Sequence, residues 1–120
     1  MTQDIHTTLH VTVKEGKIEE FNRLVEEICK AVEDNEPGAK RYQFFLNDDE
    51  KQYVLNESYV NIEAVLAHLK GAAVQIILPK ILNICKINRF EVFGDVTDEL
   101  LKTLSKVGGV NYHFLNGFSR

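Results

Sequence analysis

The chain has 120 residues, of which 44% are hydrophobic and 27% are charged, and this size and composition are typical of one soluble globular domain. Its formal net charge of −4 argues against a nucleic-acid partner, because nucleic-acid-binding surfaces are basic. No apolar run approaches the roughly 20 residues of a membrane span, and the first ten residues show no secretory signal pattern. We therefore predict a cytoplasmic protein that binds neither nucleic acid nor membrane.

Apolar residues alternate along some segments and recur every three or four positions along others, which distinguishes strands from amphipathic helices. The pattern predicts strands over residues 6–14, 40–46, 52–60, 86–96 and 110–118. It predicts helices over residues 17–35 and 97–107, and a further helix that begins at residue 61. Gly71 and Pro79 are expected to disturb this last helix before residue 84. The first six elements follow the order βαββαβ, which is the ferredoxin-like arrangement. We predict one α+β domain over residues 1–96, with 97–120 as a helix-strand extension of it.

Two short polar stretches predict turns. In Glu36-Pro37-Gly38-Ala39, proline disfavours helix at the residue before it and glycine can adopt a positive φ, so these four residues predict a type II turn. The stretch 47–50 predicts the hairpin loop between the second and third strands. Neither turn indicates any chemistry by itself.

The cysteines and histidines show no metal-binding pattern. Cys29 and Cys85 fall in apolar helical context, which favours buried, reduced thiols in a cytosolic protein. His6 and His10 lie on one face of the first predicted strand, but no further ligand has a suitable spacing. We therefore predict no metal site.

Several landmarks resemble the antibiotic biosynthesis monooxygenase-like family. The first strand closes on Lys-x-Gly, and the sequence NEPG at 35–38 precedes an aromatic strand. Residues 57–68 are similar to the family signature E-x-aromatic, four further residues, and then A-x-x-x-H. In this chain the signature residues are Glu57, Tyr59, Ala64 and His68. The likeness covers roughly residues 6 to 93 and is more specific for the fold than for the reaction.

The resemblance implies a dimeric α+β barrel, in which the sheets of two copies close face to face, and hence a homodimer. Family members include cofactor-free oxygenases of phenols and quinols, and haem-degrading enzymes. The latter use an asparagine, a tryptophan and a histidine where this chain has Leu9, Tyr59 and His68, and the chain has no tryptophan. We therefore expect no haem degradation.

The family pocket lies between the inner face of the sheet and the second helix, and by this match His68 is the candidate general base. Glu57 and Tyr59 share one strand face, so Glu57 is a candidate to orient His68, and Tyr59 is a candidate to contact an aromatic ligand. The structural alternatives are a histidine bonded to a neighbouring strand, a glutamate paired with a lysine or arginine at the sheet edge, and a core tyrosine. The candidate apolar walls of the pocket are Leu9, Val11 and Phe44.

These features predict a cofactor-independent monooxygenase that acts on a small electron-rich aromatic, such as a quinol or phenol, with molecular oxygen as co-substrate and His68 as base. The alternative is a non-catalytic dimeric barrel that binds a small hydrophobic ligand or is purely structural. A third hypothesis is a cofactor-free isomerase or lyase that uses the same pocket. A Glu57 carboxylate turned away, with His68 held by a backbone carbonyl, would favour the non-catalytic alternative.

Overall fold

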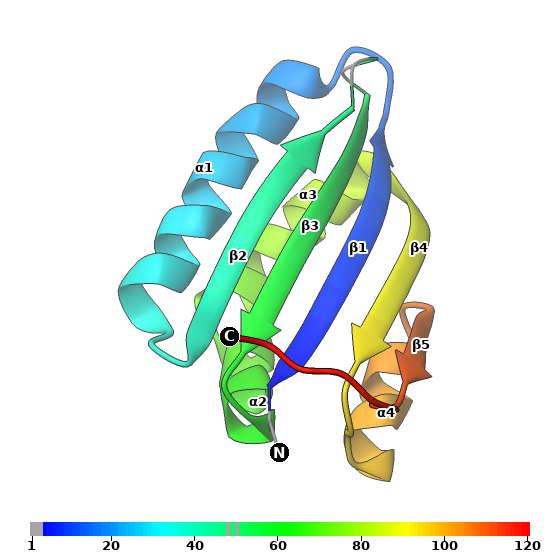
Figure 1. Ribbon diagram of the computed structural model, residues 1–120. Helices are drawn as coiled ribbons and strands as arrows, with labels where there is room; N and C mark the ends of the chain where they lie inside the picture. The colour runs from blue at the N-terminus through cyan, green and yellow to red at the C-terminus, as the bar shows by residue number, and fades with distance from the viewer. Residues whose placement is uncertain (1–3, 48, 50) are drawn as a thin grey trace.

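The computed structural model describes residues 4–47, 49 and 51–120 (Figure 1). Its elements in chain order are β1 (Ile5–Val13), α1 (Ile18–Asn35), β2 (Ala39–Leu46), β3 (Gln52–Tyr59), α2 (Ile62–Lys70), the π-helix η1 (Ala73–Ile77), α3 (Leu78–Asn83), β4 (Cys85–Phe93), α4 (Asp98–Ser105) and β5 (Gly109–Tyr112). Within the described residues, five strands form one sheet in the order β2-β3-β1-β4-β5. The first four pair antiparallel, and β5 runs parallel to β4. The predicted ferredoxin-like α+β fold is confirmed.

Helices α1, α2 and α3 cover one face of the sheet, while the other face is turned to the viewer in Figure 1 and is crossed near one end by the C-terminal segment that follows β5. Along β1, alternate residues point to the helices, so that Ile5, Val11 and Val13 are buried. Helix α1 packs an apolar stripe against this inner face, and its Phe21 and Ile28 are fully buried. We call the helix-covered side the inner face and the opposite side, which carries no helix, the open face.

The core consists of two apolar clusters on the inner face. One contains Phe21, Ile28 and Tyr53 with residues of η1 and α3. The other contains Tyr59 of β3 and Leu100 of the C-terminal helix α4. Helix α4 therefore packs two leucines, Leu100 and Leu104, into the second cluster.

The turn at residues 36–39 is present, but it is not type II. The Ala39 N–H donates to the Glu36 carbonyl at 3.0 Å, yet Gly38 lacks the positive φ that type II requires. Among the described glycines, positive φ occurs at Gly16, Gly94, Gly108 and Gly117. Gly38 meets a different need, because a Cβ there would lie 2.6 Å from the Cβ of Ala64. Glycine therefore allows this turn to approach α2 closely.

Two strand boundaries were predicted too far along the chain. Strand β4 ends at Phe93 rather than at residue 96, because Gly94 has a φ of +116° and turns the chain. The predicted last strand over 110–118 is therefore wrong beyond Tyr112, which pairs with Phe93 at the end of the β4–β5 ladder. The residues that follow have no strand beside them to pair with. Of the predicted hairpin loop 47–50, Asp48 and Glu50 lie outside the described residues.

The second helical region is broken, as the positions of glycine and proline predicted. Helix α2 ends at Lys70 with Gly71 as its C-cap. The chain then continues through η1, where the Leu78 N–H bonds to the Ala73 carbonyl five residues back, into α3, which has Pro79 in its first turn. No single helix among the described residues is long and apolar enough to cross a membrane, although the bent pair 62–70 and 73–83 together reaches that length and composition.

Candidate active site

A polar layer separates the two apolar clusters of the core. Thr7 on β1, Glu57 on β3 and His68 on α2 are only 4%, 7% and 6% exposed, respectively. Burying ionisable side chains is costly unless each has a partner. Their partners therefore define the site.

His68 lies between two carboxylates. Its Nδ1 is 2.6 Å from Glu36 Oε1, and its Nε2 is 3.4 Å from Glu57 Oε1. The side chains of all three residues are at most 9% exposed. Each ring nitrogen of His68 therefore faces a different buried carboxyl group.

Glu57 is also held by two hydroxyl groups. The Tyr59 hydroxyl donates to Glu57 Oε1 at 2.5 Å, and the Thr7 hydroxyl donates to Oε2 at 2.8 Å. The rings of Tyr59 and Tyr42 lie against His68, with centroid distances of 5.2 and 5.6 Å. We call Thr7, Glu36, Tyr42, Glu57, Tyr59 and His68 the polar cluster.

Strand register brings the sheet residues of the polar cluster together. Thr7 and Tyr42 are the partners of Glu57 on its two neighbouring strands, so the three side chains form a row across the inner face. Tyr59 follows two residues after Glu57 and shares its face. These positions depend on the pairing of strands, which the alternation of a single strand does not reveal.

The C-terminal ends of α1 and α2 position the other two residues of the polar cluster, Glu36 and His68. Glu36 directly follows α1 and precedes Pro37, so the helix end places its carboxylate over the polar layer. His68 lies in the last turn of α2, whose N-cap Asn61 accepts a hydrogen bond from the Ala64 N–H at 2.9 Å. A Cβ at Gly71 would lie 3.3 Å from Glu36 Oε2. Glycine at this position therefore leaves room for the carboxylate.

The structure places the predicted residues in two groups. His68, Glu57 and Tyr59 lie together in the polar cluster. The predicted apolar walls lie with the cluster around Phe21, where Val11 is buried and Leu9 and Phe44 pack against it. Their role as walls of a substrate pocket stays a prediction.

Sequence reasoning missed Glu36, Tyr42 and Thr7. Glu36 was interpreted only as part of a turn, although it continues the buried stripe of α1 four residues after Val32. Thr7 likewise continues the inner face of β1, and Tyr42 precedes Phe44 on the same face of β2. In each case, a polar side chain occupies a position where the periodicity of the helix or strand predicts an apolar one. This mismatch could have identified the three residues from the sequence.

The structure does not show the arrangement of Glu57 and His68 that would favour the non-catalytic alternative. The Glu57 carboxylate faces His68 rather than turning away, and Nδ1 of His68 contacts a carboxylate rather than a backbone carbonyl. The polar cluster also contains more polar groups than the three expected in the pocket from sequence.

A hollow of about 230 Å³ lies next to Tyr42, between the end of α1 and β2. Its lining includes Cys29, Lys40 and Arg41 as well as Tyr42. Burial, with a further contribution from the Glu57 carboxylate, raises the pKa of Tyr42 well above its ordinary value. Tyr42 therefore stays a neutral phenol, and its ring separates this hollow from the imidazole of His68.

The raised pKa of a buried tyrosine also predicts that the protein loses stability at high pH. Burial raises the pKa of Tyr59 far above its ordinary value of 10.0, and the Glu57 carboxylate adds to this shift. The unfolded chain then releases a proton above pH 10 that the folded chain retains, so the free energy of unfolding should fall by about 1.4 kcal/mol per pH unit for this one group. Urea unfolding at a series of pH values should show a shallower decline for Tyr59→Phe than for the parent. Tyr112→Phe, at an exposed tyrosine, is the matched control, and an equal slope in all three proteins would contradict the prediction.

The fold and its polar cluster can be compared with known proteins. The model of the family described as Antibiotic biosynthesis monooxygenase matches residues 5–77, a segment that contains every member of the polar cluster. The chain belongs to this family. No curated protein matches the sequence of this antibiotic biosynthesis monooxygenase family member.

Solved structures show the same fold. MupZ from Pseudomonas fluorescens is 21% identical, with a TM-score of 0.85 over 99% of this chain and 96% of its own. SnoaB from Streptomyces nogalater, described as a cofactor-independent oxygenase, is 14% identical, with a TM-score of 0.67 over 80% of this chain and 96% of its own. A protein from Shewanella oneidensis is 24% identical, with a TM-score of 0.63 over 77% and 88% of the two chains. The likeness to MupZ thus extends through α4 and β5.

Within the described residues, no group of three or more His, Cys, Asp or Glu side chains is arranged to hold a metal ion. Instead, His68 contacts both Glu36 and Glu57, and Glu57 accepts hydrogen bonds from the hydroxyl groups of Thr7 and Tyr59. The absence of a cofactor in this family member stays a prediction.

Proposed function

We propose that this protein is a cofactor-independent monooxygenase that oxygenates a small electron-rich aromatic, such as a quinol or phenol, with His68 as general base. The observation that carries the proposal is the buried chain of contacts from Glu36 through His68 to Glu57 and Tyr59. Such a cluster of buried ionisable groups is a marker of functional sites. Membership of the family and a fold shared with SnoaB support the same reaction class.

The polar cluster suits proton transfer. When Nδ1 of His68 donates to Glu36, the neutral imidazole is oriented with its Nε2 lone pair as the proton acceptor. Of the two carboxylates, Glu36 is the better placed to orient the ring, because its 2.6 Å contact is the shorter. Glu57, 3.4 Å from Nε2, then stabilises the imidazolium that forms when a substrate proton arrives.

The substrate itself supplies the electrons. Removal of a hydroxyl proton by His68 converts a hydroquinone to its anion, which is a better electron donor to O₂. A bond forms between a ring carbon and one oxygen atom; the O–O bond then breaks, and the second oxygen leaves as water. The balanced result is one hydroquinone and one O₂ giving one hydroxyquinone and one water, with no external reductant. The buried site excludes bulk water from the anion.

The hollow beside Tyr42 is the proposed entrance for the substrate. A phenol that enters between α1 and β2 meets the Tyr42 ring before it meets His68. We therefore infer that Tyr42 rotates to admit the substrate. Arg41 in the lining of the hollow would attract an electron-rich ring, whereas Lys40 is paired with Asp4 at 2.7 Å. Glu33 also lines the hollow.

Oxygen uptake tests the proposed function. The purified protein would be mixed with a panel of hydroquinones, catechols and polycyclic phenols in the presence of a metal chelator, and the product analysed after reaction under ¹⁸O₂. We expect chelator-resistant uptake and one labelled oxygen atom in the product. Conversion of substrate without oxygen would instead support an isomerase or lyase. Binding of these compounds without any conversion would support the non-catalytic alternative.

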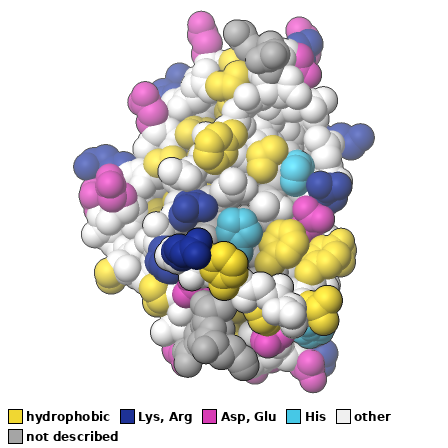
Figure 2. Space-filling view, in the orientation of Figure 1, with side chains coloured by type: hydrophobic (Ala, Val, Ile, Leu, Met, Phe, Trp, Pro, Cys, Tyr) yellow, Lys and Arg dark blue, Asp and Glu magenta, His cyan; other side chains and the backbone are white. Residues whose placement is uncertain are grey.

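We also propose that two copies associate through their open faces, as in the dimeric barrels that the family fold suggests. The open face carries exposed apolar side chains, among them Phe45 and Tyr112, which are 51% and 47% exposed. Figure 2 shows hydrophobic side chains spread over this face. Large hydrophobic side chains exposed together on one face of a small protein are consistent with an interaction surface.

A charge placed at the centre of the open face should prevent this association. Asn56 on β3 points to the open face, where its partners are Thr8 on β1 and Gln43 on β2, so Asn56→Arg would introduce two unpaired guanidinium groups between the copies. Sedimentation should show a dimer for the parent and a monomer for this variant. Asn35→Arg, at the exposed end of α1, is the charge-matched control and should remain dimeric. A monomeric parent would contradict the proposed association.

A further inference from the structure

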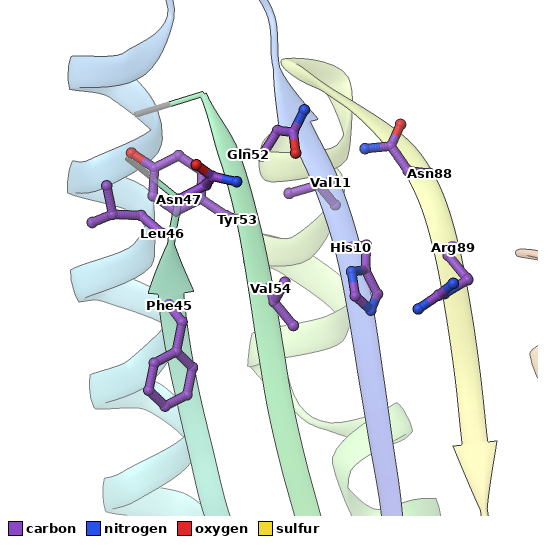
Figure 3. Close-up of a pocket in the computed structure, with 10 residues that line it drawn as sticks. All are labelled: His10, Val11, Phe45, Leu46, Asn47, Gln52, Tyr53, Val54, Asn88 and Arg89. Atoms are coloured by element: carbon purple, nitrogen blue, oxygen red, sulfur yellow. The ribbon is translucent and has the colours of Figure 1, made fainter. Parts of the chain in front are cut away.

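One polar side chain interrupts the apolar row that β1 presents to the helices. Neighbouring residues of a strand point to opposite faces of the sheet. Figure 3 shows this on β1, where His10 borders a hollow of about 530 Å³ on the open face and Val11, which is buried, lies behind the strand. Thr7 belongs to the same inward set as Val11 and is equally buried. Because valine would fill nearly the same space without burying a hydroxyl group, the hydroxyl indicates a role that valine could not fill.

The Thr7 hydroxyl holds one of the two oxygens of Glu57. The two residues are cross-strand partners on β1 and β3, and the hydroxyl donates to Glu57 Oε2 at 2.8 Å. The other oxygen, Oε1, accepts a hydrogen bond from Tyr59 and lies 3.4 Å from His68 Nε2. A carboxyl group that is held at both oxygens has one orientation. Thr7 therefore fixes the direction in which Oε1 faces the imidazole.

The position of Thr7 suits it to hold a neighbouring group rather than to react. Thr7 does not line the hollow beside Tyr42 through which the substrate is proposed to enter. Its β-branched side chain is stiff about χ1, and β1 is paired on both sides, with β3 and with β4. The hydroxyl is therefore a rigid donor beside the Glu57 carboxyl group.

We propose that Thr7 is a positioning residue for the oxygenase reaction, whose hydroxyl holds the Glu57 carboxylate in the orientation that stabilises the imidazolium of His68. The inference rests on the proposed function, in which His68 takes the substrate proton. A carboxylate that is fixed before the proton arrives needs no reorganisation at the moment of reaction. Tyr59 does not fix this orientation alone, because it bonds to the same oxygen that faces His68.

Two substitutions at this one position test the proposal. Thr7→Val removes the hydroxyl and keeps the branched shape, and it should lower kcat for substrate-dependent oxygen uptake by about tenfold, because a hydrogen bond to a charged group is lost. KM should stay within about twofold of the parent value, since Thr7 does not bind the substrate. Thr7→Ser keeps the hydroxyl and should recover most of the rate. Thr103→Val makes the same change at an exposed position of α4 and should leave both constants unchanged.

A double variant tests whether Thr7 acts through Glu57. Adding Thr7→Val to Glu57→Gln should lower kcat much less than Thr7→Val does in the parent, because the group that Thr7 holds has already been changed. Circular dichroism would establish that each variant is folded. Equal losses in the two backgrounds would overturn the proposal. So would a folded Thr7→Val variant with the parent kcat, or a loss that Thr7→Ser does not restore.

The ring nitrogens of His68 give a readout that does not depend on turnover. In ¹H–¹⁵N spectra of the imidazole without substrate, Thr7→Val should shift the signal of Nε2, which faces Glu57, more than that of Nδ1, which lies 2.6 Å from Glu36. A shift at Nε2 no larger than the shift at Nδ1 would overturn the proposal. If the parent oxygenates no compound of the panel, the proposed function fails, and this comparison still decides whether Thr7 orients Glu57 against the imidazole.

Discussion

Replacing His68 by glutamine is expected to lower the rate of substrate-dependent oxygen uptake by about 10²- to 10⁴-fold, the contribution that a positioned general base usually makes. Glutamine retains a polar side chain between the carboxylates of Glu36 and Glu57, but it cannot accept a proton near neutral pH. The effect should appear in kcat and in kcat/KM, because proton removal belongs to the transition state rather than to substrate binding. Initial rates with the best hydroquinone of the panel give the measurement.

Another histidine provides the control for this experiment. His113 is exposed and contacts Asp95 at 3.2 Å, so His113→Gln makes the same chemical change far from the polar cluster and should retain the parent rate. Circular dichroism and oligomeric state would establish that His68→Gln is folded. A folded His68→Gln variant with the parent rate would remove His68 from the mechanism, and equal uptake without any protein would mean that the substrate oxidises on its own.

Replacing His68 by alanine should also destabilise the protein strongly. Glu36 and Glu57 would then be left buried without the imidazole between them, and a buried hydrogen-bonding group that loses its partner typically costs about 1–3 kcal/mol, with more for a charged group. The side chains of both glutamates are at most 9% exposed, so water cannot replace the lost partner without a local rearrangement. The free energy of unfolding in urea measures this loss directly.

A triple variant distinguishes two causes of the lost stability: the buried carboxylates without a partner, and the cavity left by the imidazole. Adding Glu36→Gln and Glu57→Gln to His68→Ala removes both carboxylates while it retains the cavity, so the triple variant should recover a large share of the lost stability. It should not recover activity. If the triple variant is no more stable than His68→Ala alone, the loss arises from the cavity, and the polar cluster is not held together by charge.

The expected loss of activity in His68→Gln and the expected loss of stability in His68→Ala have a common origin, the burial of polar groups in the polar cluster. An apolar core at the same positions would often be as stable or more stable than a buried set of charges. Functional sites commonly carry this kind of cost in exchange for preorganised groups. We therefore expect activity and stability to respond in opposite directions when the polar cluster is replaced by well-packed apolar residues.

The local sequence pattern determined most of the fold. Alternation along β1 and β3 and helical spacing along α1 are properties of neighbouring residues, so they can be read without knowing the partners of each element. The same applies to the break at Gly71. The order βαββαβ then limited the topology to the ferredoxin-like arrangement, and the family resemblance singled out His68, Glu57 and Tyr59.

Only the tertiary structure decided how these residues are connected. Glu36 lies 32 positions before His68, and the contact between them exists because α1 ends where α2 passes over the sheet. Gly38 is glycine because of Ala64 rather than because of its own φ, and the last strand stops at Tyr112 because its neighbour does. Each of these features depends on a contact between segments far apart in the chain, whereas periodicity reports only which side of one element is buried.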